Sequence, residues 1–245
     1  MTALQWPVLA MFGLLFGSLA SALSYRLPRG LKVAVDRSRC PACEAVLTPR
    51  DLIPLASWLL AKRRCRHCGA PVSWRYPALE TGMAVLFVAA WAAGSGDWVR
   101  SLLLMATAFG LVVIVVADLE QFIVPDAMVL FLVPVGLLWR WRTGGAWVDA
   151  GLGAAVGLGI SLAVRQGFQA WRGREALGLG DVKLFGVAGL FVGISGLGAL
   201  LTIAGATGMV FGVSWRVLGK GALFPFAPAI CLALAIRLAL DRGLM

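Results

Sequence analysis

The chain has 245 residues, of which 60% are hydrophobic and only 14% are charged, and its mean hydropathy is +0.87. Soluble domains carry about 25% charged residues, so this composition excludes an ordinary soluble domain and predicts an all-α, polytopic membrane helical bundle in contact with lipid. The formal net charge of +10, taken alone, would suit a protein that binds nucleic acid. The basic residues are distributed as in an oriented membrane protein instead, and no nucleic-acid partner is expected.

About eight apolar segments are expected, because stretches near or above the ~17 residues that span a bilayer recur along the chain. They are predicted at residues 5–25, 77–94, 98–117, 126–140, 147–164, 182–193, 196–214 and 223–240. Segment 182–193 is short, so it either tilts or joins its neighbour as a re-entrant pair. The first segment lacks the basic start and the cleavage site of a secretory signal, which predicts a retained helix.

Two of the segments contain glycines at four-residue spacing, Gly153/Gly157 and Gly189/Gly193. Small residues at this spacing let helix backbones approach closely, so these glycines predict helix packing. The predicted organisation has three parts, which are a first membrane helix at residues 1–25, a cytoplasmic loop domain at 26–76 and a helical membrane core at 77–245.

The basic residues predict the orientation of the bundle. Loop 26–76 holds eleven of the 22 Lys and Arg residues and is cytoplasmic by the positive-inside rule. Connections 165–183 and 215–222 then lie on the same side, with Arg165, Arg172, Arg174, Lys183, Arg216 and Lys220. The opposite side holds only Arg100, Arg140, Arg142, Arg237 and Arg242. Tryptophans at segment edges fit an interfacial aromatic belt: Trp6, Trp98, Trp139, Trp141, Trp147 and Trp215.

The cytoplasmic loop contains two C-x2-C pairs, Cys40/Cys43 and Cys65/Cys68. Each such turn places two thiolates on one side of a metal, and two turns complete a tetrahedral four-cysteine zinc site. Two disulfides are the alternative, but a cytoplasmic loop is reducing. Since protein would supply all four ligands, the zinc is expected to be structural and to contribute folding energy to a loop too short for a large core. His67 is expected to be a bystander.

Two aspartates lie at the ends of apolar runs. Asp118 closes the run 111–117, and Asp181 follows Gly178-Leu179-Gly180 and opens the run 182–190. An ionisable group at such a position is costly and is a functional hypothesis by default. The predicted orientation puts both on the cytoplasmic face, on different helices. Two separate interfacial charges are the alternative reading.

If the two carboxyl groups meet, they share a proton, because both cannot easily ionise. One then activates water while the other protonates the departing amine or polarises the carbonyl. The pair titrates as a unit, so neither aspartate is assigned as the base. A serine or cysteine nucleophile with a histidine base is excluded, because the only histidine is His67 in the metal motif.

Other charged residues flank the two aspartates. Pro125 is expected to start a helix, and Asp126 to stabilise that start through the helix dipole. Glu120 and Asp126 are therefore given structural or substrate-facing roles. Lys183 either modulates the site or extends to the membrane interface. Cys231 is predicted to be a buried, apolar thiol.

These residues resemble those of the bacterial type IV prepilin peptidases, which are membrane aspartyl proteases of the GxGD type. The resemblance covers most of the chain, and the motifs that carry it are Gly17–Pro28, the four cysteines, Ile53–Leu59, Arg75–Glu80, Asp118–Asp126, Ala176–Leu184 and Phe224–Pro228. It implies that Asp118 and Asp181 are catalytic. They would cut the basic leader from prepilins or type II secretion pseudopilins after a glycine, at the cytoplasmic face of the bacterial inner membrane.

The resemblance also implies methylation of the new N-terminus with S-adenosylmethionine as cofactor. Arg75 and Glu80 are the candidates for this second activity, although the sequence identifies no cofactor-binding residue. The family's early motif usually has Asn where this chain has Ser21, and bulkier apolar residues where it has Leu19 and Ala20. Two other functions are alternatives to the peptidase. A proton-coupled transporter predicts midplane charges and internal repeats, which are not seen, and a zinc-bearing scaffold predicts that Asp118→Asn leaves function intact.

Overall fold

The computed structural model describes residues 5–33, 37–173, 177–221 and 223–240, in which all regular elements are helical apart from two isolated β-bridges. Eight α-helices and two short 3-10 helices lie in these ranges. Their bounds are α1 Gln5–Arg26, η1 Leu27–Arg29, η2 Pro49–Leu52, α2 Ala56–Leu60, α3 Arg75–Ala93, α4 Trp98–Gln121, α5 Asp126–Arg142, α6 Trp147–Arg172, α7 Leu179–Val217 and α8 Ala227–Leu240.

The predicted polytopic helical bundle is confirmed. Five helical segments are long and apolar enough to cross a membrane: Gln5–Arg29, Arg75–Ala93, Trp98–Gln121, Trp147–Arg172 and Leu179–Val217. Helices α5 and α8 also match predicted segments but have only 17 and 14 residues. Arg174, Ala176 and Arg242, which belong to the predicted charge pattern and motifs, lie outside the described residues.

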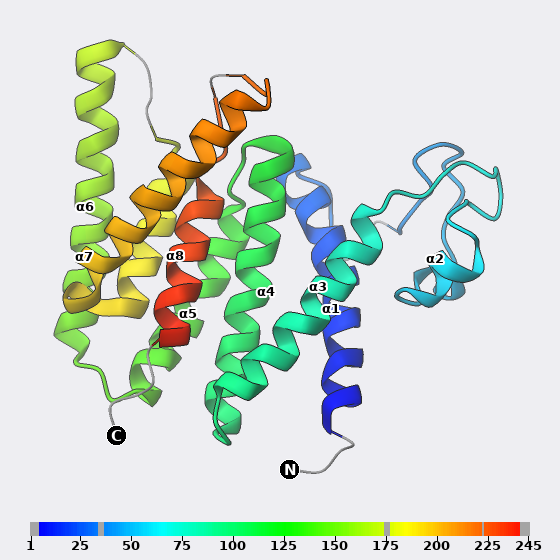
Figure 1. Cartoon of the computed structure of the whole chain (residues 1–245), viewed down its shortest axis with the longest axis horizontal. Coiled ribbons are helices and arrows are strands. Elements are labelled where there is room, and N and C mark those ends of the chain that lie inside the picture. The colour runs from blue at the N-terminus through cyan, green and yellow to red at the C-terminus, as the bar shows by residue number, and fades with distance from the viewer. Residues whose placement is uncertain (1–4, 34–36, 174–176, 222, 241–245) are drawn as a thin grey trace. The chain divides into compact units, whose positions relative to one another are not determined.

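The chain forms two compact units, residues 1–113 and 114–245. In unit 1, α1 packs against α3, and Figure 1 shows the loop that carries α2 next to the start of α3. The helices approach closely because Gly13 and Gly17 face the backbone of Ala84 and Glu80, where a Cβ would overlap. The Phe16 ring packs against Phe87 with 5.3 Å between centroids.

In unit 2, α7 is the central helix and contacts α5, α6 and α8. Its packing against α6 depends on the predicted glycines. The backbones of Gly153 and Gly189 leave no room for a side chain on either, and Gly157 faces the backbone of Phe185. The helix-packing prediction for these residues is confirmed, and the two helices are antiparallel with Gly153 opposite Gly189 and Gly157 opposite Phe185.

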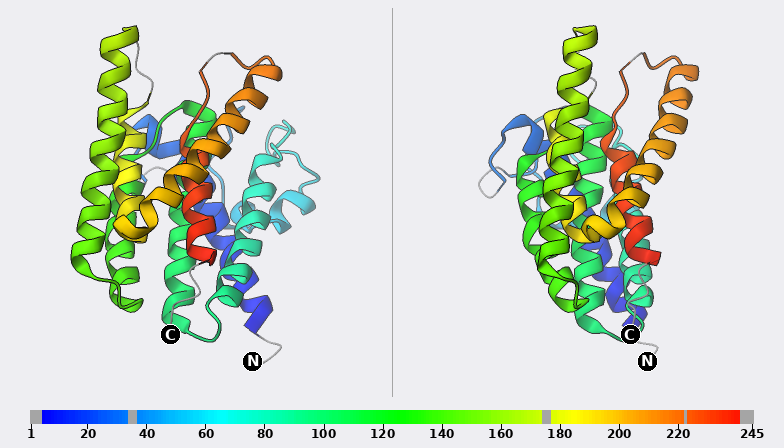
Figure 2. Two further views of the ribbon diagram at one scale, coloured as in Figure 1. Left: turned by 60° about the vertical axis from the view of Figure 1, so that its left-hand side comes forward. Right: turned by 90° about the vertical axis from the view of Figure 1, so that its left-hand side faces the viewer.

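Helix α7 is a hairpin of two helical halves. At Gly193 the backbone leaves the helical conformation, with φ 70° and ψ 174°, and only glycine adopts such a φ at low cost. Figures 1 and 2 show the chain running one way along the yellow half and returning along the orange half beside α8. Segments 182–193 and 196–214 are therefore the two arms of this hairpin, which turns beside the start of α6.

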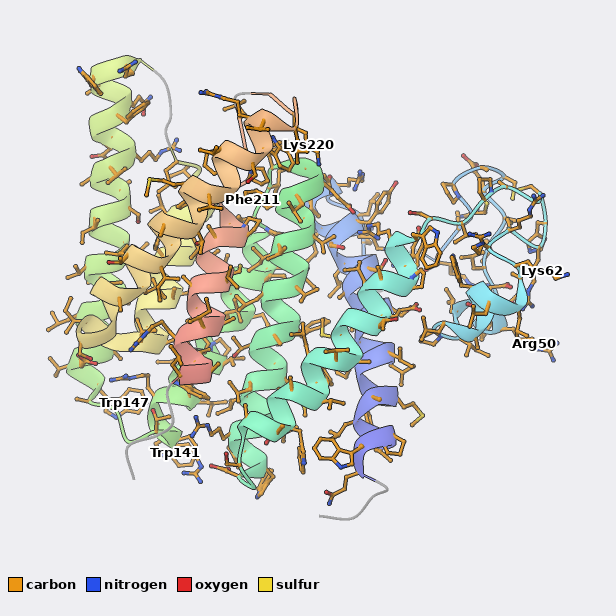
Figure 3. All side chains as sticks on the ribbon, in the orientation of Figure 1. Arg50, Lys62, Trp141, Trp147, Phe211 and Lys220 are labelled. Atoms are coloured by element: carbon orange, nitrogen blue, oxygen red, sulfur yellow. The ribbon has the colours of Figure 1, made fainter. Side chains whose placement is uncertain are left out.

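Charged and polar groups hold the hairpin at Gly193. Asp149, in the first turn of α6, pairs with Arg140 at 2.8 Å and accepts a hydrogen bond from the backbone N–H of Ser195 at 3.2 Å. Figure 3 shows Trp141 and Trp147 at one end of unit 2 and Lys220 at the opposite end. Basic and aromatic residues thus mark both ends of the unit, as expected for two membrane interfaces.

Candidate carboxylate site and metal centre

Asp118 lies in the last turn of α4 and is 5% exposed. The helix continues through the apolar run before it, so the side chain enters a core that includes the fully buried Ile114 and Ala117. Its Oδ2 atom accepts a hydrogen bond at 3.0 Å from the backbone N–H of Ala227, the first residue of α8. A carboxylate buried to this degree needs such donors, because an unpaired buried charge is costly.

Asp181 is the third residue of α7 and is 8% exposed. Its Oδ2 atom accepts the N–H of Gly178 at 3.3 Å, whereas Oδ1 has no hydrogen-bond partner within the described part of the chain. A side chain at Gly180 would overlap Cβ of Val124. The Gly-x-Gly-Asp sequence therefore allows the connection between α4 and α5 to lie directly on the start of α7.

The two carboxyl groups are brought close enough to interact electrostatically, although they come from different helices. Cys231 of α8 is 3% exposed and lies close to both carboxyl groups. Two buried carboxyl groups, one of which has an oxygen without a donor, can hold and transfer a proton to or from a water molecule. The arrangement suits general acid–base hydrolysis.

The other acidic residues do not join this pair. Asp126 begins α5 after Pro125, as predicted, and accepts a hydrogen bond from Lys183 Nζ at 2.7 Å. Both side chains of this ion pair are about half exposed or more, and Glu120 is exposed at the end of α4. Sequence reasoning did not find the Ala227 N–H or the position of Cys231. For Ala227 the only signal was the Phe224–Pro228 motif, to which it gave no role, and nothing in the sequence places Cys231 near the two aspartates.

The four predicted cysteines form one cluster. All four sulfurs lie within 4.8 Å of one another, and the Sγ atoms of Cys40 and Cys68 are 3.9 Å apart. A disulfide needs about 2.05 Å, whereas a tetrahedral zinc with bonds of about 2.3 Å separates its sulfurs by about 3.8 Å. The donor set and its dimensions therefore fit a bound metal, and His67 is not a member of the cluster.

The two C-x2-C turns have the same backbone. In each, the N–H of the first cysteine donates to the carbonyl five residues on. The N–H of the residue after the second cysteine donates to the carbonyl of the first cysteine, and all four distances are 2.8–3.0 Å. Glu44 and Gly69 occupy this latter position with φ of 57° and 72°. Backbone N–H groups of Ala42 and Cys43 lower the pKa of Cys40 to about 7, which favours the thiolate that a metal requires.

Arg75 and Glu80, the methyl-transfer candidates, lie inside unit 1. The guanidinium of Arg75 donates to the Ser21 hydroxyl at 2.7 Å and the Ser24 hydroxyl at 2.8 Å, which joins α3 to α1. Glu80 is 6% exposed and accepts the N–H of Leu55 at 2.8 Å. Ser21, where the resembled family usually has Asn, is thus an internal partner of Arg75.

Comparison with known proteins identifies the family. A model described as the Bacterial Peptidase A24 N-terminal domain matches residues 11–93, and one described as the Type IV leader peptidase family matches residues 105–213. The chain is 33% identical to a prepilin leader peptidase/N-methyltransferase of Bacillus subtilis (strain 168), over 91% of this chain and 89% of the relative. This chain belongs to the type IV leader peptidase family.

Other relatives of this family match over a similar share of their length. The identity is 31% to the prepilin leader peptidase/N-methyltransferase of Neisseria gonorrhoeae, over 91% of this chain and 86% of the relative. The identity is 32% to the type 4 prepilin-like proteins leader peptide-processing enzyme of Escherichia coli O78:H11, over 92% of this chain and 91% of the relative. No solved structure matches the chain significantly. The leader peptidase region 105–213 contains both aspartates but ends before Ala227.

Proposed function

We propose that this protein is a prepilin leader peptidase and N-methyltransferase of the bacterial inner membrane, with Asp118 and Asp181 as its catalytic residues. The observation that carries the assignment of these residues is their convergence. Two buried carboxyl groups from α4 and α7 interact at one site, within the region that matches the leader peptidase family.

The proposed reaction is hydrolysis of the peptide bond between the leader and the mature pilin. One carboxylate takes a proton from water, whose oxygen attacks the scissile carbonyl carbon, and the other carboxylic acid gives its proton to the departing amine. Oδ1 of Asp181, which accepts no hydrogen bond from any described residue, is available to the water or to the substrate. Because both groups are buried, these charge interactions are stronger than in bulk solvent.

The four-cysteine cluster supports a structural zinc rather than a catalytic one, because it leaves no coordination position open to substrate. S-adenosylmethionine would supply the methyl group for the new N-terminal amine. The substrates would be type IV prepilins or type II secretion pseudopilins.

The orientation is also part of the proposal, with the zinc loop and Lys220 facing the cytoplasm and the Trp141/Trp147 end facing outward. An impermeant maleimide should label Arg142→Cys in intact cells, and Lys62→Cys only after permeabilisation. Wild-type protein, with its native thiols inside, is the control. Labelling of Lys62→Cys in intact cells would invert the orientation.

The deciding experiment is cleavage of a prepilin by purified protein in detergent, with the new N-terminus read by mass spectrometry, with and without S-adenosylmethionine. Asp118→Asn and Asp181→Asn should each lower the rate by about 10²- to 10⁴-fold. Asp126→Asn is the matched control, because its carboxylate is exposed and lies outside the pair, and should retain cleavage. Normal cleavage by either catalytic-site variant would contradict the assignment.

A further inference from the structure

The segment that leads from α7 into the first residue of α8, Phe224-Pro225-Phe226-Ala227, lies against the carboxylate site and has no part in the proposed chemistry. Pro225 and Ala227 are fully buried or nearly so. The segment's backbone N–H at Ala227 donates a hydrogen bond to Oδ2 of Asp118, at 3.0 Å. A backbone donor to a buried carboxylate is short, charge-assisted and directional, so it can fix the orientation of that carboxyl group.

Aromatic contacts connect the same segment to the helix that carries Asp181. The Phe226 ring packs against Phe185 with 6.2 Å between centroids. Phe185 is one helical turn beyond Asp181, so the two side chains lie on the same face of α7. The segment therefore contacts Asp118 through its backbone and the Asp181 helix through a ring, and it can set the position of one relative to the other.

The second half of α7 has two glycines that accommodate the rings of this segment. Gly208 faces Phe226 so closely that a Cβ would overlap the ring, and a Cβ on Gly212 would lie 3.1 Å from the ring of Phe224. Phe224 also packs against Phe211 of this half, with centroids 6.4 Å apart. Gly205, on the same helix, has open space where a Cβ would be.

We propose that Phe224–Ala227 is a positioning element for catalysis, which rests on the proposed peptidase function. Gly208 and Gly212 seat the two rings, the rings place Ala227, and the Ala227 N–H holds the Asp118 carboxylate where it meets Asp181. Ala227 acts through Asp118 and needs no contact with substrate. Displacing a catalytic group by about 1 Å can cost about 10²-fold in rate, so a small shift of this segment is enough to matter.

The first test compares Gly208→Ala with Gly205→Ala in prepilin cleavage by the full chain in detergent. Both substitutions add a methyl group and raise helix propensity, but only the one at 208 displaces Phe226. Gly208→Ala should lower kcat by about 10- to 100-fold with KM within about twofold, because binding of the substrate is not altered. Gly205→Ala should keep the wild-type kcat.

A double variant separates displacement of the ring from any general effect of Gly208→Ala. In a Phe226→Leu background the smaller side chain leaves room for the added methyl group, so Gly208→Ala should produce no further loss of kcat. Equal losses in both backgrounds would overturn the proposed route through Phe226, and so would a wild-type kcat for Gly208→Ala alone.

Hydrogen exchange gives a readout that does not depend on activity. The Ala227 amide should exchange at least about tenfold faster in Asp118→Ala than in wild type, whereas Asp181→Ala should leave its exchange unchanged. Equal exchange in wild type and Asp118→Ala would show that the hydrogen bond does not form, which overturns the proposal. If wild type and Gly205→Ala both fail to cleave prepilin, it is the proposed function that fails, and the exchange result still decides whether Ala227 holds Asp118.

Discussion

Glu80, on α3, accepts a hydrogen bond at 2.8 Å from the backbone N–H of Leu55, which lies in the loop between the two cysteine pairs. Leu55 has φ 56° and ψ −49°, a sparsely populated conformation that costs a non-glycine residue about 1–3 kcal/mol. A buried carboxyl group of a membrane helix thus stabilises an unfavourable turn in the polar loop. The fold of the loop depends on this contact as well as on the cysteine cluster.

Replacing Glu80 by alanine should loosen that turn. The Leu55 N–H loses its acceptor, which costs about 1–3 kcal/mol, and residues 49–60 should exchange their amide protons faster. Glu80→Gln keeps an acceptor oxygen and should show a smaller effect. Hydrogen exchange measured by mass spectrometry checks both variants, and unchanged protection in Glu80→Ala would show that the contact does not stabilise the loop.

The cysteine cluster should bind one zinc ion per chain. Cys43→Ser and Cys65→Ser should each lose most of the metal, because a structural site needs its four thiolates, and the loop should become sensitive to proteases since metal binding is coupled to its folding. Elemental analysis of the purified protein measures this. Cys231→Ser is the control and should keep its zinc, because Cys231 is not part of the cluster. Full zinc content in Cys43→Ser would make the ligand assignment wrong.

The equivalent residues Glu44 and Gly69 should respond in opposite ways to substitution. Both have positive φ, which glycine tolerates and other residues adopt at a cost of about 1 kcal/mol. Glu44→Gly should therefore tighten zinc binding about fivefold, and Gly69→Ala should weaken it by a similar factor. A Cβ at Gly69 meets no atom, so the effect is conformational. Competition with a chelator gives both affinities, and a shift in the same direction for both variants would refute the explanation.

Asp149 should be important for the stability of the α7 hairpin. Asp149→Ala removes the partner of Arg140 and the acceptor for the Ser195 N–H, which should cost about 1–3 kcal/mol. Asp149→Asn keeps an acceptor without the charge and should be intermediate. Thermal unfolding in detergent micelles tests this order, and wild-type stability for Asp149→Ala would contradict it.

Much of the fold could be predicted from the sequence, because long apolar segments in a membrane protein have few alternatives to helices. The break in α7 at Gly193 could not be predicted in this way. Gly193 was predicted as a packing residue beside Gly189, but it also breaks α7, and nothing local distinguishes a glycine that packs from one that turns. The turn depends on Asp149, which is 44 positions away and supplies the acceptor for Ser195.

The side chains of the candidate site could be predicted from the sequence, but their hydrogen bonds and ion pairs could not. Cysteine spacing predicted the cluster, and residues that end apolar runs identified Asp118 and Asp181. The Ala227 N–H could not be found, because a backbone donor carries no side-chain signature and lies 109 positions from its acceptor. The sequence left two roles for Lys183, modulating the site or extending to the membrane interface. The structure pairs it with Asp126.

The antiparallel packing of α6 and α7 has a consequence for the depth of the proposed cleavage site in the bilayer. Gly153 lies opposite Gly189 and Gly157 opposite Phe185, so the same register brings Ser161 level with Asp181. From Trp147, in one interfacial belt, Ser161 is about 21 Å along α6 at 1.5 Å per residue. With Trp147 in the predicted interfacial belt, a hydrocarbon core of about 30 Å would place the proposed cleavage site several ångströms below the other surface. Under the proposed function, water would have to enter to that depth, and the substrate's scissile bond would have to be exposed there to be cut.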